Sequence, residues 1–445
     1  MDDGKSTCSS TQGFDGTKPS AKLHSRIWLD PTCGVRCLAC VGVVVFHMAW
    51  YTGAASNDKH AVDKALAQQP WFTFVFNPDP PMQAFMCLTG YYWKRVLRVV
   101  PAYYGILVVI RALNHFIDES SGLPAYMWNA FFGPLGAFDQ GLCKNTMRYN
   151  LIFAQNQLPT FGCYTIAWSL AVQMQFWFIF PLALLLLQPQ SKGFRKRAAQ
   201  AMLATIGAVH AVLMWELMPM QVYNHPNMEY FGQLLFVGRH GYFGSLVRLA
   251  PLCWGALAAI IVLDSSLMQR MHTGKVHALW MLLVISNFAG TFVGKFGPTD
   301  PGHFLANPAT IAFAYVCIVG VTSPLLSAVT LVLTTTQQPD NSGFLAKALS
   351  HRAFVWLADI TYDIYLLHPL VTLVVFHMLP PPMWFKPEEP SWQNFAAVSG
   401  LVLAGSVAAS WVHNWFWSRV LGSFATRYKT AQAPHLNGVK ETSRH

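Results

Sequence analysis

The amino-acid sequence predicts an all-α fold, a polytopic transmembrane helical bundle of about ten spans with both termini in the cytosol. Of its 445 residues, 53% are hydrophobic and only 11% are charged, whereas soluble domains carry about 25% charged residues. The apolar residues gather in long stretches, and about 20 such residues cross the hydrocarbon core of a bilayer. Basic residues are concentrated in alternate connecting segments, as in membrane proteins of fixed orientation.

Ten stretches are apolar and long enough to span a bilayer. In chain order they are residues 34–51, 71–92, 99–117, 164–188, 199–218, 244–263, 277–294, 308–333, 354–379 and 395–418. The second stretch is the least regular, because prolines interrupt it near residue 80. The polar ends predict a disordered cytosolic tail at 1–27 and a second cytosolic tail at 427–445. One transmembrane domain is therefore expected over residues 28–426.

The distribution of positive charge sets the predicted orientation. With the N-terminus in the cytosol, most Lys and Arg residues fall on cytosolic segments and few fall on the opposite side, as the positive-inside rule requires. Topology thus explains the net charge of +10, and we expect a lipid bilayer, and no nucleic acid, as a partner. The protein is predicted to be a multi-pass integral protein of the plasma membrane or the secretory pathway.

The first apolar stretch carries two ionisable residues. Arg36 lies near its start and His47 lies near its middle. On a helix these positions are about 16 Å apart, since each residue adds ~1.5 Å. Ionisable side chains inside a membrane are costly and usually mark a functional site. The spacing suits a reaction that takes a charged donor from one side and works within the membrane.

Other polar residues are expected at a similar depth on separate spans. His368 lies in the ninth stretch, and Gln173 and Gln175 lie in the fourth. Polar groups at one depth can share a cavity with His47. The alternative is that each of them only forms a hydrogen bond to a neighbouring helix, which is common in membrane bundles.

A basic cluster is predicted at the cytosolic face, between the second and third stretches. It contains Arg95 and Arg98 and lies near the depth of Arg36. Guanidinium groups bind phosphate oxygens through paired hydrogen bonds, so the cluster favours a phosphorylated donor. The alternative is that these charges only anchor the topology.

Two cysteines fall in the long segment 118–163 on the side opposite the cytosol. Cys143 and Cys163 would meet oxidising conditions there in a secretory-pathway membrane, so a disulfide is expected. Two free thiols are the alternative. No cluster with metal-ligand spacing stands out, and we expect no metal cofactor.

Five short motifs follow one another along the chain. They are Gly34-x-Arg36-x-x-Ala39 with His47, Phe85-x-x-x-Thr89-Gly90-Tyr91, Arg95-x-x-Arg98-x-x-Pro101-x-Tyr103, Trp168-Ser169-Leu170 with Met174-Gln175-Phe176, and Thr361-Tyr362-x-x-Tyr365-Leu-x-His368. Their order resembles that of the acyltransferase-3 family over residues 34–370. The cysteine-bearing segment before the fourth motif resembles the eukaryotic branch named for nose resistance to fluoxetine.

The resemblance implies an integral membrane acyltransferase. Such an enzyme moves an acyl group, expected to be acetyl, from cytosolic acyl-CoA (acetyl-CoA) to a hydroxyl of a carbohydrate, lipid or small molecule at the luminal or outer side. The matching positions make His47 the catalytic histidine and place Arg36, Arg95 and Arg98 on the donor side. The remaining candidates are His368 and Gln175 for catalysis, and Trp168, Tyr362 and Tyr365 for the acceptor.

The chemistry of imidazole agrees with this assignment. A neutral ring can take the proton of an acceptor hydroxyl as a general base, a contribution of roughly 10²–10⁴-fold. The ring of His47 could instead accept the acyl group itself, which would make the transfer a two-step reaction. The sequence leaves both routes open.

Two departures from the family pattern leave other functions open. Arg95 follows Tyr91 after four positions, where family members have a longer segment, and Gln173 replaces an acidic residue. An inactive relative of the acyltransferases is one alternative. A non-enzymatic membrane transporter or lipid-handling protein built on the same helices is another.

Overall fold

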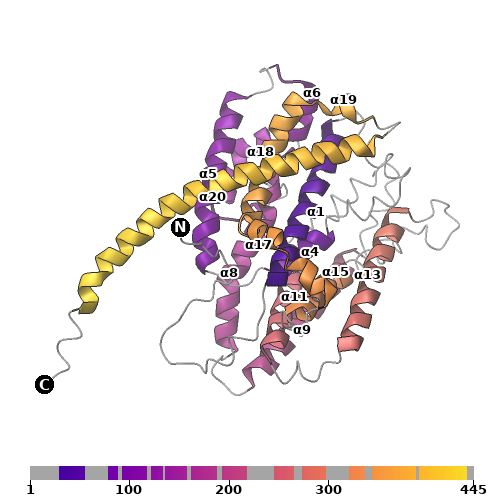
Figure 1. The fold of residues 1–445 in the computed structure, drawn as a ribbon, viewed down its shortest axis with the longest axis vertical. Helices are drawn as coiled ribbons and strands as arrows, with labels where there is room; N and C mark the ends of the chain where they lie inside the picture. Colours follow the sequence, from indigo (N-terminus) through magenta and orange to yellow (C-terminus); the bar gives the residue numbers. More distant parts are fainter. Residues whose placement is uncertain are drawn as a thin grey trace.

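The structure of the protein is a computed structural model. It describes residues 30–55, 79–88, 93–117, 122–133, 136–157, 162–187, 193–217, 245–264, 273–296, 320–335, 343–386 and 390–437. Within these ranges all regular secondary structure is helical, which confirms the predicted all-α class. The helices form one bundle, from which the carboxyl end of the last helix projects (Figure 1).

Each of the ten predicted stretches overlaps a helix of the bundle. The longer helices are α1 (Asp30–Ala55), α4 (Asp79–Cys87), α5 (Trp93–Phe116), α7 (Gln140–Leu151), α8 (Trp168–Leu186), α9 (Phe194–Leu217), α11 (Ser245–Leu263), α13 (Thr273–Phe296), α15 (Gly320–Thr335), α18 (Thr361–Met378) and α20 (Trp392–Asn437). Short elements are α6 (Ala125–Met127), η2 (Trp128–Phe132), η3 (Gln155–Gln157), η4 (Thr165–Ala167), α16 (Phe344–Leu349), α17 (Arg352–Ala358) and α19 (Pro381–Trp384).

Several helices are long and apolar enough to cross a membrane. Among the described residues they cover Pro31–Ala55, Val99–Phe116, Thr165–Ala183 and Trp392–Trp417, and the bent pair α17–α18 adds a fifth candidate. The apolar parts of α11 and α15 are shorter. These helices indicate a membrane protein, which is helical throughout the described residues.

The ninth predicted stretch, 354–379, contains a sharp bend. It consists of α17 and α18, which meet at an angle of 73°. The helix ends because Asp359 and Ile360 form a turn. The hydroxyl of Thr361 donates to the carbonyl of Ala358 at 3.0 Å, which satisfies an acceptor that the interrupted helix leaves open.

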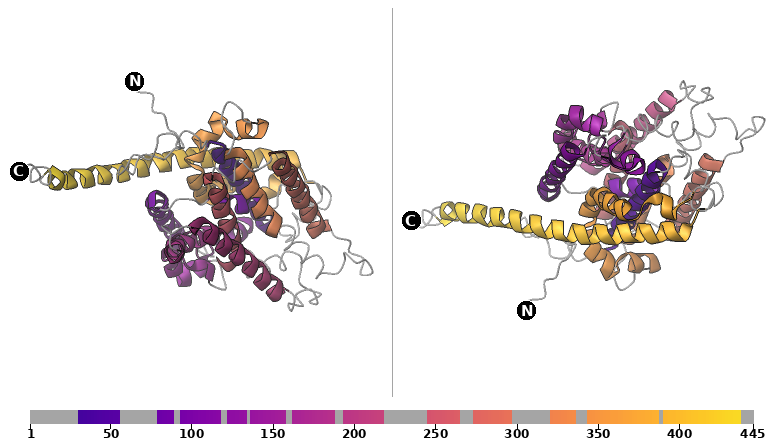
Figure 2. Two further views of the ribbon diagram at one scale, coloured as in Figure 1. Left: turned by 90° about the horizontal axis from the view of Figure 1, so that it is seen from below. Right: turned by 90° about the horizontal axis from the view of Figure 1, so that it is seen from above.

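The second and tenth stretches also differ from a simple span. Helix α4 begins in a proline-rich sequence, where prolines suit a first turn, and it has nine residues. The short junction between Tyr91 and Arg95 involves residues 89–92, which lie outside the described part. Helix α20 continues to Asn437, beyond residue 427, and its carboxyl end extends away from the other helices (Figure 2).

Helix α1 lies at the centre of the bundle. It contacts α4, α15, α16, α17, α18, α20 and η2. Its amino end approaches α16 closely, because a Cβ atom at Gly34 would collide with the backbone of Leu349. A Cβ atom at Gly255 of α11 would likewise collide with the backbone of Cys87 in α4. Small residues at such crossings are typical of membrane helix packing.

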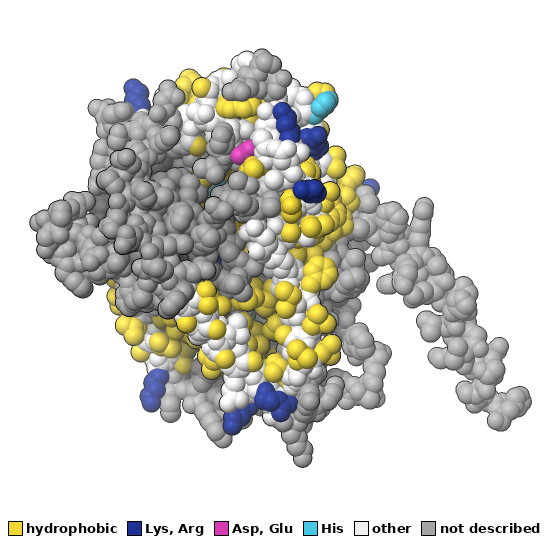
Figure 3. Space-filling view, turned by 180° about the vertical axis from the view of Figure 1, so that it is seen from behind, with side chains coloured by type: hydrophobic (Ala, Val, Ile, Leu, Met, Phe, Trp, Pro, Cys, Tyr) yellow, Lys and Arg dark blue, Asp and Glu magenta, His cyan; other side chains and the backbone are white. Residues whose placement is uncertain are grey.

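Apolar side chains also cover much of the outer surface. Figure 3 shows them across the middle of one face, with Lys and Arg side chains towards the two ends. Helix α8 exposes large apolar side chains, namely Phe178, Ile179, Leu182, Leu185 and Leu186. Soluble monomers rarely expose contiguous apolar patches of this kind. Contact with lipid hydrocarbon explains both the apolar zone and its charged borders.

Candidate active site

Two histidines from distant parts of the chain meet inside the bundle. Nδ1 of His47 in α1 lies 2.9 Å from Nε2 of His368 in α18. The two rings are stacked, with centroids 4.9 Å apart and an interplanar angle of 16°. His368 is fully buried, whereas His47 is partly exposed. His47 is therefore the more accessible ring of the pair.

The hydrogen bonds assign the protons of this pair. Nδ1 of His368 lies 2.7 Å from the carbonyl oxygen of Tyr365, and a carbonyl can only accept, so this nitrogen carries a proton. A charged imidazolium is costly in a buried, apolar position. In the neutral ring Nε2 of His368 accepts, and Nδ1 of His47 therefore donates to it. This leaves a lone pair on Nε2 of His47.

The Tyr365 side chain joins the histidine helix α18 to the start of α8. Its hydroxyl donates to the carbonyl of Ile166. The Ser169 hydroxyl lies 2.7 Å from the Tyr365 oxygen and, because the tyrosine proton is already engaged, Ser169 is the donor of this bond. The ring of Phe85 stacks on that of Tyr365 at 5.8 Å. Sequence reasoning did not single out Ser169, although it lies within the fourth motif.

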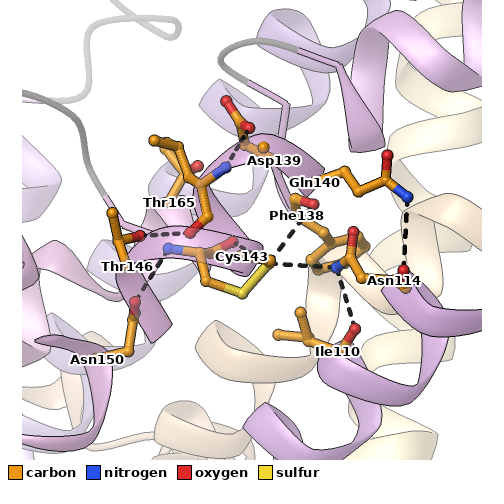
Figure 4. Close-up of a disulfide and its surroundings, with 12 residues drawn as sticks. Ile110, Asn114, Phe138, Asp139, Gln140, Cys143, Thr146, Asn150 and Thr165 are labelled. Carbon is orange, nitrogen blue, oxygen red and sulfur yellow. Dashed lines mark hydrogen bonds between the residues drawn. A yellow bond between two sulfur atoms is a disulfide. The ribbon is translucent and has the colours of Figure 1, made fainter. Parts of the chain in front are cut away.

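The disulfide between Cys143 and Cys163 is present, as predicted. Figure 4 shows its surroundings. The backbone N–H of Cys163 donates to Oδ1 of Asn150 at 3.0 Å, and the amide of Asn114 donates to Sγ of Cys143 at 3.3 Å. The first bond connects the segment that contains Cys163 to α7, and the second connects α7 to α5.

The carboxyl ends of α1 and α5 lie near the part of the fold that contains the Cys143–Cys163 disulfide. The ring of Tyr51 in α1 lies 5.3 Å from that of Phe131 in η2. The amide of Gln140 donates to the carbonyl of Ile117, directly after α5, at 2.8 Å. The amino ends of both helices therefore point towards the opposite side of the bundle.

The predicted donor-side arginines lie at those amino ends. Arg36 lies in the second turn of α1, and residues 95 and 98 lie in the first two turns of α5. The side chains of Arg95 and Arg98 are outside the described part of the chain, so their contacts with Arg36 stay a prediction.

Comparison with known protein families agrees with this geometry. A family model described as an acyltransferase domain matches residues 26–412, most of the chain. The chain belongs to the acyltransferase-3 family. Comparison with curated proteins gives no match, and comparison with solved structures gives none either. In this family member the matched region begins just before α1 and includes both histidines.

The predicted acceptor residues of this acyltransferase-family protein differ in their surroundings. The hydroxyl of Tyr362 is buried and has no hydrogen-bond partner among the described residues. Trp168 opens α8 and is buried, and the guanidinium of Arg248 lies 5.3 Å from the centroid of its ring. Arg248 is buried in the apolar helix α11 and was not predicted to contribute to a site, although a charge inside a span is a signal of function.

Gln175 makes a different set of contacts. Its amide nitrogen donates to the carbonyl of Phe153 at 2.7 Å and to Oδ1 of Asn156 at 2.8 Å. Its oxygen accepts from Gln157 at 3.3 Å. These bonds direct the amide towards residues 153–157 and fix α8 against that segment. The catalytic role expected for Gln175 stays a prediction. Gln173, at the position where the family pattern has an acid, is buried.

A second buried polar network was missed by sequence reasoning. Oδ1 of Asp363 in α18 accepts from Nδ1 of His413 in α20 at 2.9 Å. The indole of Trp417 donates to Nε2 of the same ring at 3.0 Å, so this histidine is neutral. The network fastens α20 to the helix that carries His368. Within the described ranges no group of three His, Cys, Asp or Glu residues could hold a metal ion.

Proposed function

We propose that the protein is a multi-pass membrane acyltransferase that moves an acetyl group from cytosolic acetyl-CoA to a hydroxyl at the luminal or outer side. The acceptor class comprises carbohydrates, lipids and small molecules with a free hydroxyl. Ten spans with both termini in the cytosol, in the plasma membrane or the secretory pathway, would place donor and acceptor on opposite sides. The disulfide-closed segment supports placing the chain in the eukaryotic branch.

The histidine pair is the observation that carries this proposal. His47 is held by a 2.9 Å hydrogen bond to His368, which fixes both the ring and its tautomer. The free lone pair on Nε2 is the group that a general base requires. This nitrogen forms no hydrogen bond within the described residues, which supports its role as the base.

The transfer can be written with His47 as the base. Nε2 takes the proton of the acceptor hydroxyl while the hydroxyl oxygen attacks the acyl carbon and forms a C–O bond. The C–S bond then breaks, and the CoA thiolate leaves. The thiolate takes the proton from Nε2, which gives free CoA and the acetyl ester and restores the neutral pair.

The arginines at the amino ends of α1 and α5 are the proposed binding site of the donor. Acyl-CoA carries several phosphates, and guanidinium groups bind phosphate oxygens more selectively than ammonium groups do. Arg36, Arg95 and Arg98 would hold the nucleotide part at the membrane face. The acyl end would then extend along α1 towards His47.

Tyr362 and Trp168 are the proposed contacts of the acceptor. The Tyr362 hydroxyl has a proton that no described residue accepts, so it can bind an acceptor oxygen. The Tyr365 proton is already engaged by the Ile166 carbonyl. Tyr365 is therefore proposed to position α18 and His368 and not to bind the acceptor through its hydroxyl.

The test uses sealed, oriented membrane vesicles and acetyl-CoA labelled in the acetyl group. The natural chain is expected to release CoA and to move label onto luminal material, and His47→Gln is expected to abolish both. His377→Gln is the matched control, because His377 is exposed at the end of the same helix as His368. Equal and negligible transfer by folded natural and His47→Gln proteins would reject the enzyme in favour of a transporter or an inactive relative. Label retained on the denatured protein would reveal an acyl-histidine and reject the one-step route.

A further inference from the structure

Tyr51 lies one helical turn after His47 on α1. Its side chain is 2% exposed, and its hydroxyl is buried without a hydrogen-bond partner in the described part of the protein. A buried hydroxyl that forms no hydrogen bond costs stability, since it has lost its bonds to water. Such groups are rare in folded proteins and call for an explanation such as a bound ligand or a catalytic role.

The surroundings of Tyr51 connect it to the histidine pair. Its ring stacks on that of His47, with centroids 5.9 Å apart and an interplanar angle of 19°. A second ring contact is with Phe131 in η2, with centroids 5.3 Å apart. The ring of Tyr365 contacts the other histidine, His368, with centroids 6.0 Å apart. The unengaged hydroxyl therefore belongs to the same buried site as the two imidazoles.

The two tyrosines of this site differ in the state of their protons. The Tyr365 hydroxyl donates to Ile166 and accepts from Ser169, so it has no proton left for a substrate. The Tyr51 hydroxyl has a donor to offer. Sequence reasoning chose Tyr365 because it lies in a family motif, whereas Tyr51 is visible as a candidate only once its partners are known.

We propose that the Tyr51 hydroxyl donates a hydrogen bond to the carbonyl oxygen of the acyl group while His47 acts on the acceptor hydroxyl. The inference rests on the proposed acyltransferase function and adds a substrate-contacting residue to it. When the acceptor oxygen attacks, the C=O electrons move onto the carbonyl oxygen, and the Tyr51 O–H stabilises that charge. When the C–S bond breaks the C=O bond re-forms, and the Tyr51 O–H bond stays intact throughout.

The first test is Tyr51→Phe in the full-length protein, which removes only the hydroxyl. Loss of one donor to a developing oxyanion lowers kcat by about 100-fold or more. We expect such a loss in CoA release and label transfer from acetyl-CoA, with KM for acetyl-CoA little changed. The melting temperature should be unchanged or higher, because the removed hydroxyl had no partner. A purely structural tyrosine would instead lose stability and activity together.

Tyr104→Phe is the matched control. The Tyr104 hydroxyl donates to the carbonyl of Leu151 at 2.7 Å, away from the histidine pair, so its loss removes a real hydrogen bond without touching the site. We expect natural activity from this variant. Activity of Tyr51→Phe close to that of Tyr104→Phe would overturn the inference and leave the proposed function standing. No CoA release or transfer by the natural chain would overturn both.

A second measurement does not depend on turnover. Infrared spectra of acetyl-CoA labelled with ¹³C at the carbonyl would be recorded with His47→Gln, which stops the reaction, and with His47→Gln/Tyr51→Phe. A hydrogen bond to the carbonyl oxygen lowers its stretching frequency. The double variant should therefore show the higher frequency. Equal frequencies in the two spectra would contradict a bond from Tyr51 to the acyl carbonyl.

Discussion

Nδ1 of His47 lies 2.9 Å from Nε2 of His368, although the two residues are separated by 321 positions in the chain. One ring comes from the central helix α1 and the other from α18, just after the break that bends the ninth stretch. The contact gives His47 a fixed tautomer with a lone pair facing away from His368. A single hydrogen bond thus fixes the relative orientation of two imidazoles inside the bundle, as the proposed role of His47 as a base requires.

His368→Ala should lower the rate of acetyl transfer by about 10- to 100-fold, because His47 loses the acceptor that fixes its ring and tautomer. His368→Gln should retain more activity, since an amide oxygen can accept from Nδ1 of His47. Initial rates with labelled acetyl-CoA test this order. A Gln variant as inactive as the Ala variant, at equal stability, would argue against a positioning role.

Arg36→Ala should raise KM for acetyl-CoA about tenfold or more with a smaller effect on kcat, because a charge-assisted bond to phosphate is lost. The KM of Arg36→Lys should lie between those of the natural chain and Arg36→Ala, since lysine keeps the charge but lacks the planar guanidinium group. Arg148→Ala is the control, because Arg148 is exposed in α7 on the opposite side. An equal change of KM in Arg36→Ala and Arg148→Ala would contradict a role of Arg36 in binding acetyl-CoA.

Cys143→Ser combined with Cys163→Ser should lower the free energy of unfolding by about 3 kcal/mol, the value expected for opening a loop of this size. The two cysteines are 20 positions apart. Thermal unfolding in detergent, with and without reductant, measures the effect. The double-serine protein should be insensitive to reductant, and a natural chain that is equally insensitive would show that the bond is not formed.

Gly34→Ala should destabilise the fold by about 1–3 kcal/mol, because the added methyl group collides with the Leu349 backbone and neither helix can yield cheaply. Gly400→Ala in α20 meets open space and should be neutral or stabilising, since alanine favours a helix. Melting temperatures of the two variants provide the comparison. Equal melting temperatures would show that α1 can move away from α16.

The helices could be predicted because apolar length is a local property of the chain. The break at Asp359 and Ile360 was not predicted, because neither glycine nor proline marks it in the sequence. Tyr51, Ser169 and Arg248 were missed for a different reason. Their importance lies in which partners they have or lack, and partners come from other helices.

The sequence by itself determined the class of the protein and the order of its family motifs, since composition and spacing are read directly from the chain. It also identified His47, His368 and the cysteine pair as candidates. The tertiary structure decided which of these meet, because a contact of 2.9 Å between α1 and α18 depends on the crossing of helices far apart in sequence. It also decided which hydroxyls keep a free proton, because hydrogen bonds are directional and each proton can be donated to one principal acceptor.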